Sequence, residues 1–288
     1  MLTKLLEKTN NSTVQQGILD AFNILYPKGI QYEELRLIVT DRAKYMPLAI
    51  KNLKEMFPNL HYVTYICHAI HNLCDKIRKD NPLANKFIGL VKDILSKSPQ
   101  RQQIFFEFIN LNLPSTVILT RWGTWIDAVV FYAENFDKIR LFLNEIESKS
   151  QSVKTAKFLM DDELLKNELL NIYDYAYLSK YITKLEAENL KVKKQMNIIN
   201  KIKIKLEKLD KNYFDKFTSI LEKNPDLFKF TSSSNDLNHM LLIKYAPLTS
   251  IDFERSFSIY NNILAANRQC LGLDSIKYMN NIKFNNFL

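Results

Sequence analysis

Apolar residues in the first 80 positions form two kinds of pattern, one typical of helices and one typical of strands. In residues 13–26 they recur three and four apart, which is typical of one side of a helix. Residues 35–40 and 61–66 are short runs rich in β-branched and aromatic side chains, and each precedes a stretch of helical spacing, at 43–57 and 68–79. The order helix, strand, helix, strand, helix predicts part of an α/β sheet.

The pattern changes after Pro82. Residues 82–239 show only helical periodicity, which is interrupted at Pro99, Pro114 and Pro225. The chain is therefore predicted to be mixed but predominantly α, with an incomplete α/β core interrupted by a large all-helical insertion. The predicted segments are a partial core at 1–80, the helical insertion at 81–240, and C-terminal core helices at 241–288.

Composition narrows the class of protein. With 288 residues the chain is long enough to bury a sizeable core, and 47% hydrophobic residues exclude a disordered protein. The chain has 5 glycines, too few for an all-β protein with many tight turns. A net charge of +9 favours a partner that carries phosphate or another acidic surface.

Cysteine usage and hydropathy indicate where the protein works. Cys67, Cys74 and Cys270 are too few for a disulfide framework, and no CxxC pair suggests a zinc site. No run of about 18 apolar residues is present to cross a bilayer. We therefore expect a nuclear or cytosolic protein in a reducing compartment, without a membrane partner.

Asp41 is the first candidate for chemistry because it directly follows the first predicted strand. Carboxylates at the C-terminal end of a strand commonly bind metal ions in α/β enzymes. An isolated aspartate between a strand and a helix is more commonly a helix cap. Both interpretations stay open from the residues alone.

Two further segments are candidates for nucleic-acid binding. Arg121 and Trp122 lie at a predicted turn, where the indole could stack on a base, whereas Trp125 is expected to be a core residue. A lysine-rich helix follows later in the chain, and its lysines either track phosphates or form an ordinary solvated side. The lysines taken as candidate contacts are Lys191, Lys193, Lys194, Lys201 and Lys205.

The C-terminal segment 249–268 predicts a helix with an apolar side. It also carries the adjacent pair Glu254 and Arg255, which in most proteins would be a solvated ion pair. A carboxylate that faces the interior would instead need a partner, a metal ion or a catalytic role. The apolar side consists of Phe253, Phe257, Ile263 and Leu264.

Three separated motifs resemble the hAT superfamily of transposases. They are TDRAKYM at 40–46, TRWGTW at 120–125 and TSIDFERSFS at 249–258, in the order in which that family has them. The resemblance extends over almost the whole chain, from residue 10 to residue 284. The last motif is the most specific and the first is weak by itself.

The resemblance implies an RNase H-like fold that is split by a helical insertion, with three carboxylates that hold divalent metal for DNA strand cleavage and joining. Asp41 matches the second aspartate of that triad and Glu254 matches its glutamate. Trp122 matches a tryptophan that lies close to transposon-end DNA in the family. The segment of Phe253, Phe257, Ile263 and Leu264 resembles the C-terminal dimerisation region, which implies self-association or pairing with other hAT-type chains.

DNA strand transfer uses two divalent ions about 4 Å apart, and Mg²⁺ or Mn²⁺ needs oxygen ligands. The metal-binding residues of such a site are therefore expected to be carboxylates. The sequence nevertheless departs from the family. Asp20 is the only aspartate before Asp41, and it lies in the middle of the first predicted helix, so two carboxylates of three remain. His68 and His71 share a helical face but lack a third ligand, so we expect structural or surface roles.

Three hypotheses follow. The first, which we favour, is a transposase-derived protein that keeps DNA-binding and dimerisation surfaces but lacks cleavage activity, because a metal ligand is missing. The second is a fragment of an active DDE-type DNA transposase, for which coding sequence upstream of Met1 would supply the missing strand and aspartate. The third is a protein-interaction module without DNA binding, which salt-dependent DNA affinity would exclude.

Overall fold

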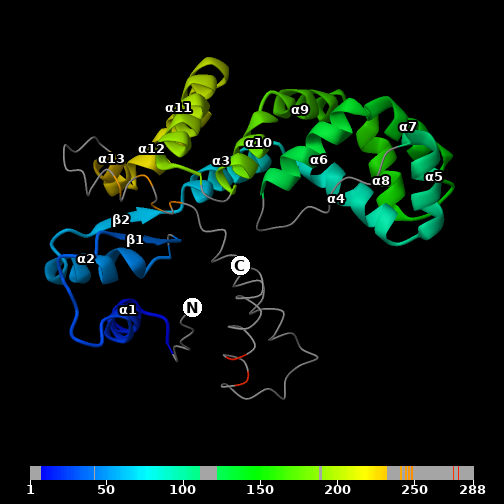
Figure 1. Ribbon diagram of the computed structural model, residues 1–288. Coiled ribbons are helices and arrows are strands. Elements are labelled where there is room, and N and C mark those ends of the chain that lie inside the picture. The colour runs from blue at the N-terminus through cyan, green and yellow to red at the C-terminus, as the bar shows by residue number, and fades with distance from the viewer. Residues whose placement is uncertain are drawn as a thin grey trace. The chain divides into compact units, whose positions relative to one another are not determined.

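The computed structural model is predominantly helical and contains a small two-stranded parallel sheet (Figure 1). Contacts divide the chain into two compact units. Unit 1 comprises Met1–Ile66, Glu188–Gln195 and Glu222–Leu288, and unit 2 comprises Cys67–Ala187 and Met196–Leu221. The residues described are 8–41, 43–110, 122–187 and 190–231, with the single positions 241, 244, 246, 248, 275 and 278.

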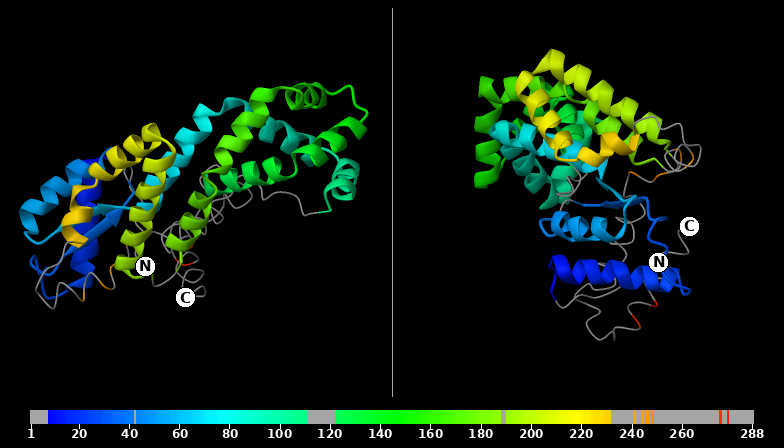
Figure 2. Two further views of the ribbon diagram at one scale, coloured as in Figure 1. Left: turned by 90° about the horizontal axis from the view of Figure 1, so that it is seen from above. Right: turned by 90° about the vertical axis from the view of Figure 1, so that its left-hand side faces the viewer.

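Unit 1 contains the sheet. Strands β1 and β2 run parallel and in register from the pair Leu37–His61 to the pair Thr40–Thr64, and helix α2 connects them. Figures 1 and 2 show α2 between the sheet and α1, with α13 beside β2. The elements are α1 (Asn11–Leu25), β1 (Leu37–Thr40), α2 (Met46–Met56), β2 (His61–Thr64) and α13 (Pro225–Thr231).

Local sequence sets the bounds of α1. The Asn10 side chain accepts a hydrogen bond from the Thr13 N–H at 2.9 Å, and the Thr13 hydroxyl accepts one from the Asn10 N–H at 3.1 Å. This reciprocal capping box satisfies N–H groups that the first turn leaves without helical partners. After the helix ends, Gly29 adopts φ +113°, a conformation that side chains with a Cβ rarely adopt. The helix and strands expected in this region are confirmed.

The apolar core of unit 1 lies along α2. Its buried residues repeat every three or four positions, so they occupy one side of the helix. Phe22 of α1 packs against Phe57 with ring centroids 5.6 Å apart. The buried cluster consists of Met46, Ile50, Leu53, Phe57 and Leu60.

The outer edge of β2 is closed by side chains from a distant part of the chain. Asn224 accepts a hydrogen bond from the Thr64 N–H at 3.2 Å and donates one to the Thr64 carbonyl at 3.0 Å. Asp226 accepts the Tyr62 N–H at 2.9 Å and also pairs with Lys54. These side chains replace the strand that would otherwise satisfy the backbone donors of β2.

Unit 2 is built from helices. Its core is rich in aromatic residues that meet edge to face, as Phe105 and Phe142 do at 5.0 Å and Phe87 and Tyr132 do at 5.7 Å. The elements are α3 (Ile66–Asp80), α4 (Pro82–Ser96), α5 (Pro99–Ile109), α6 (Trp122–Glu134), α7 (Phe136–Glu145), α8 (Gln151–Met160), α9 (Glu163–Tyr173), α10 (Tyr177–Leu185), α11 (Val192–Leu209) and α12 (Lys211–Glu222). The first residues of α3 and α11 are counted with unit 1.

The helical character predicted after Pro82 is confirmed, because the described residues between Pro82 and Thr231 form helices and no strand. Trp125 is 1% exposed, which confirms that it is a core residue. The RNase H-like core and the segments 1–80, 81–240 and 241–288 remain predictions. Within the described ranges, no helix combines the length and the apolar character needed to cross a bilayer.

Candidate nucleic-acid interface

Helix α11 carries exposed lysines on one side and apolar core contacts on the other. The buried residues Ile199, Ile202 and Leu206 form its inner side. Glu207 is its one acidic residue, so the lysines are little neutralised within the helix. The exposed lysines are Lys193, Lys194, Lys201, Lys205 and Lys208, and Lys191 precedes the helix, also exposed.

Four of these lysines share one side of the helix, and we call them the α11 lysine row. Lys201, Lys205 and Lys208 are spaced i, i+4 and i+7, and Lys194 lies two turns earlier on the same side. At 1.5 Å per residue, the row extends over about 21 Å. That length matches about six phosphate steps of a strand in duplex DNA at 3.4 Å each.

Two tyrosines of α10 adjoin the row. The Lys205 Nζ lies over the ring of Tyr177, 4.3 Å from its centroid. The rings of Tyr177 and Tyr181 meet edge to face at 5.8 Å, and the Lys184 Nζ lies 5.9 Å from the centroid of Tyr181. We call these four residues the basic-aromatic surface.

The two rings differ from ordinary core aromatics because they are half-buried and each lies beside an ammonium group. Burial raises the pKa of the Tyr177 hydroxyl, which therefore stays neutral at physiological pH. A cation over an aromatic face contributes about 0.5 to 1 kcal/mol at an exposed site, so Lys205 is held in place while its N–H groups stay able to bind phosphate.

Sequence reasoning missed Tyr177, Tyr181 and Lys184. The signal was present in the segment YLSKYITK, where two tyrosines stand four residues apart and a lysine follows three residues later. This spacing places all three on one side of a helix. Their relation to Lys205 was not visible, because 24 residues separate Lys205 from Tyr181 and the approach of α10 to α11 is a tertiary contact.

Trp122 is the first residue of α6, which confirms the helix predicted to start near this position. The remaining candidates lie outside the described residues. They are Arg121 and Glu254, together with the dimerisation residues Phe253, Phe257, Ile263 and Leu264.

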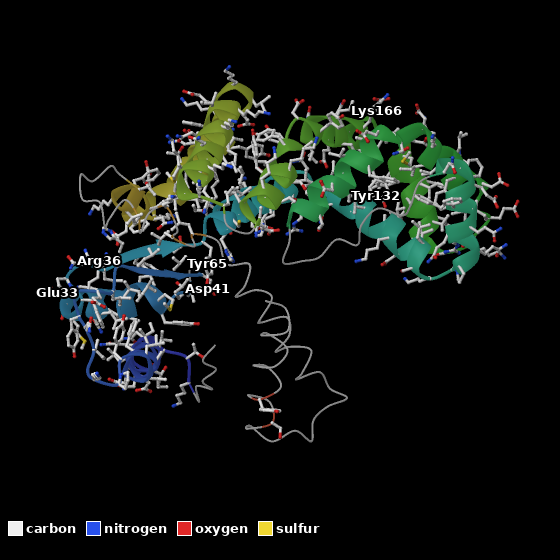
Figure 3. All side chains as sticks on the ribbon, viewed as in Figure 1. Glu33, Arg36, Asp41, Tyr65, Tyr132 and Lys166 are labelled. Carbon is white, nitrogen blue, oxygen red and sulfur yellow. The ribbon has the colours of Figure 1, made fainter. Side chains whose placement is uncertain are left out.

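Asp41 directly follows β1 and is exposed. Its backbone carbonyl accepts hydrogen bonds from the Thr40 hydroxyl at 2.6 Å and the Tyr62 hydroxyl at 3.4 Å. The helix-cap interpretation of Asp41 is wrong, because α2 begins at Met46 with Tyr45 in the cap position. Figure 3 shows Asp41 and Tyr65 at the same end of the sheet, where the parallel strands finish.

The described residues contain no group of three or more histidine, cysteine, aspartate or glutamate side chains that could hold a metal ion. Asp41 is thus not part of a group of three such side chains in that part of the chain. His68 and His71 meet ring to ring at 5.9 Å, and His71 is buried. Cys67 and Cys74 of α3 are buried free thiols, and burial raises the pKa of Cys74 above its ordinary range.

Comparison with known proteins gave no match to a protein-family model, to a curated protein or to a solved structure.

Proposed function

We propose that this protein is a hAT transposase-derived nucleic-acid-binding protein that does not cleave DNA. The observation that carries the proposal is the placement of Lys205 over Tyr177, beside Lys201 and Lys208 on the same side of α11. A row of lysines next to half-buried aromatic rings is the combination that proteins use to follow a phosphate backbone and stack bases.

The electrostatic part of the proposal concerns the α11 lysine row. Each lysine that neutralises a phosphate releases condensed counterions, and the affinity then falls as salt rises. With four contacts, the slope of log K against log salt would be about −3.6 for duplex DNA and about −2.8 for a single strand. The net charge of +9 adds long-range attraction to the same partner.

The aromatic part concerns the kind of nucleic acid. Stacking on Tyr177 or Tyr181 requires an unpaired base, because the bases of a duplex are already stacked on each other. We therefore expect single strands, or DNA ends with unpaired bases, to bind better than blunt duplex of the same length. Trp122, matched to a tryptophan that lies close to transposon-end DNA in the family, and the neighbouring Arg121 would add to this preference.

The sheet of unit 1 has one arrangement that the resemblance implies. An RNase H-like core requires parallel strands with a carboxylate at their C-terminal end, and β1, β2 and Asp41 have this arrangement. Self-association through the segment of Phe253, Phe257, Ile263 and Leu264, or pairing with other hAT-type chains, is the second part of the proposed role.

The proposal that this chain does not cleave DNA rests on the carboxylates that the resemblance assigns to it. Asp20, the only aspartate before Asp41, lies within α1 and accepts a hydrogen bond from Gln16 at 2.8 Å. Asp41 and Glu254 would then be two ligands where two-metal chemistry needs three carboxylates. Binding of Mg²⁺ or Mn²⁺ by this pair would be weak and would not align two ions.

Fluorescence anisotropy of labelled DNA tests the proposal. The full chain is titrated with single-stranded, blunt duplex and overhang-bearing oligonucleotides of equal length at several salt concentrations. We expect salt-dependent affinity with the blunt duplex weakest. Salt-independent binding would refute the phosphate contacts of the α11 lysine row. No binding at low salt would refute DNA binding and favour the interaction module.

A further inference from the structure

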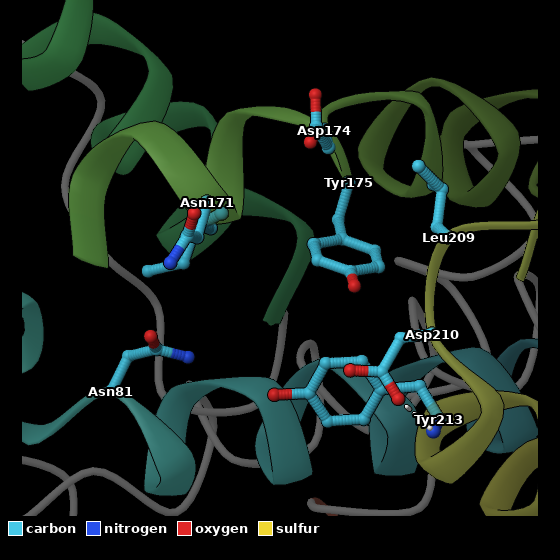
Figure 4. Close-up of a pocket in the computed structure, with 8 residues that line it drawn as sticks. Asn81, Asn171, Asp174, Tyr175, Leu209, Asp210 and Tyr213 are labelled. Carbon is cyan, nitrogen blue, oxygen red and sulfur yellow. Dashed lines mark hydrogen bonds between the residues drawn. The ribbon is translucent and has the colours of Figure 1, made fainter. Parts of the chain in front are cut away.

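A cavity in unit 2 is lined by acidic and neutral residues, in contrast to the lysines of the basic-aromatic surface. It has a volume of about 280 Å³ and lies where α3, α9 and α11 end. None of the described residues that line it is basic, although the whole chain has a net charge of +9. Its polar and aromatic lining is Asn81, Asn171, Asp174, Tyr175, Asp210 and Tyr213 (Figure 4).

Tyr175 is the feature that points to a ligand. Its side chain is 8% exposed, and Figure 4 shows its hydroxyl pointing into the cavity. Among the described residues this hydroxyl has no hydrogen-bond partner. The hydroxyl oxygen is therefore free to accept a hydrogen bond from a group bound in the cavity.

The aromatic faces make the cavity suitable for a cation. The rings of Tyr175 and Tyr213 meet edge to face, with centroids 5.3 Å apart and planes at 85°. Because the two planes are nearly perpendicular, the rings form two adjacent walls of the cavity. The face of an aromatic ring is negative, so it attracts a cation.

The carboxylates of Asp210 and Asp174 are negative, like the ring faces, and therefore also attract a cation. Asp210 uses one oxygen to accept the N–H groups of Asn212 at 2.7 Å and Tyr213 at 3.1 Å, which caps α12. Its other oxygen has no hydrogen-bond donor among the described residues. Asp174 borders the same cavity.

The phenol groups of Tyr175 and Tyr213 are protonated, which suits a cavity that attracts a cation. Burial raises the pKa of Tyr175 to about 12, and the charges of Asp210 and Asp174 add to the rise. The pKa of Tyr213 is also raised, first by burial and then by Asp80. Both phenols are therefore neutral at physiological pH, and their oxygens are able to accept hydrogen bonds from an ammonium group.

We infer that this cavity binds an organic ammonium group, held by the carboxylates of Asp174 and Asp210, the ring faces of Tyr175 and Tyr213, and the Tyr175 hydroxyl oxygen. A four-carbon amine, which has the length of a lysine side chain, fits within this volume. The ligand is thus either a free linear amine or a lysine of another protein. The inference does not depend on nucleic-acid binding.

Isothermal titration calorimetry of the full chain tests the inference with two ammonium probes, 1,4-diaminobutane and N-acetyl-lysine methylamide. Butane-1,4-diol is the uncharged control, and sodium chloride is held constant. Binding of the diamine alone identifies a free amine, and binding of the lysine derivative identifies a protein side chain. Failure of both ammonium probes, or equal binding of the diol, would overturn the inference.

Variants locate the binding. Tyr175→Leu removes the ring face and should weaken binding about fivefold or more, whereas Tyr175→Phe keeps the face and should weaken it less. Asp174→Asn is at an exposed position and should weaken binding about threefold to tenfold. Asp215→Asn makes the same charge change on α12 at an exposed position outside the cavity lining. Equal affinity of all four variants would also overturn the inference.

Discussion

Asn224 brackets the backbone of Thr64, because its side-chain amide accepts from the N–H at 3.2 Å and donates to the carbonyl at 3.0 Å. An amide side chain has one acceptor and one donor group at this spacing, so it can replace the missing edge of a neighbouring strand. Asn224 is 6% exposed, which keeps water from competing for these bonds.

Removal of this bracket should destabilise unit 1. Asn224→Ala leaves a backbone donor and acceptor of Thr64 without partners, and we expect the free energy of unfolding to fall by about 1 to 3 kcal/mol. Urea unfolding followed by far-UV circular dichroism measures the change. Asn212→Ala, at an exposed position on α12, is the matched control and should change it by less than about 0.5 kcal/mol. Equal effects of the two substitutions would contradict the role of the bracket.

Stability should decrease in acid because of Asp226. Burial alone would raise the pKa of this carboxyl, but the hydrogen bonds from Lys54 and from the Tyr62 N–H outweigh it and hold the pKa below the ordinary value of 3.8. A depressed pKa gives stability that is fully present above the unfolded-state value and is lost as the pH falls through the folded-state value.

Unfolding midpoints in urea between pH 6 and pH 2 measure this contribution. The wild-type midpoint should fall mainly below about pH 4, and Asp226→Asn should flatten that part of the profile. Asp161→Asn is the control, since Asp161 pairs with Arg140 but its side chain is 76% exposed. An unchanged acid profile in Asp226→Asn would refute the assignment.

The salt dependence of DNA binding should include a contribution from the positive charge of Lys205. Lys205→Gln removes one phosphate contact, so the slope of log K against log salt should become shallower by about 0.7 for a single strand or about 0.9 for a duplex. Lys166→Gln removes the same charge from an exposed position on α9, labelled in Figure 3, and should leave the slope unchanged. If both substitutions change the slope alike, the contact is not at α11.

Tyr177 and Tyr181 should discriminate between kinds of DNA. Replacement of Tyr181 by alanine removes a stacking surface and should weaken single-strand binding by about 1 to 3 kcal/mol, with little effect on blunt duplex. Anisotropy titrations with both substrates give the comparison. A uniform loss on both substrates would indicate damage to the fold, which the circular dichroism spectrum would reveal.

Cleavage of DNA should be absent. The full chain incubated with DNA and Mg²⁺ or Mn²⁺ should produce no more nicked product than Asp41→Asn or Glu254→Gln does, since two carboxylates cannot align two ions. Denaturing gels of end-labelled DNA give the readout. Product that requires Glu254 would show that this chain is an active transposase.

The fold was accessible from sequence where local signals were strong. The short runs rich in β-branched and aromatic residues at 35–40 and 61–66 predicted both strands, and proline positions matched the starts of α4, α5 and α13. The closure of β2 by Asn224 and Asp226 was not predictable, because the partners are about 160 residues apart in sequence. The lysines of α11 were found from charge, whereas Tyr177 became a candidate only once Lys205 was seen above its ring.

The position of Asn224 in the chain has a consequence for synthesis. The Thr64 N–H is made 160 residues before its acceptor. At about 5 to 20 residues per second, ribosomes take about 8 to 32 seconds over that interval, during which the nascent β2 presents an open edge. Such an edge is a template for mispairing with neighbouring chains. A nascent chain of this protein is therefore most exposed to aggregation before residue 224 emerges.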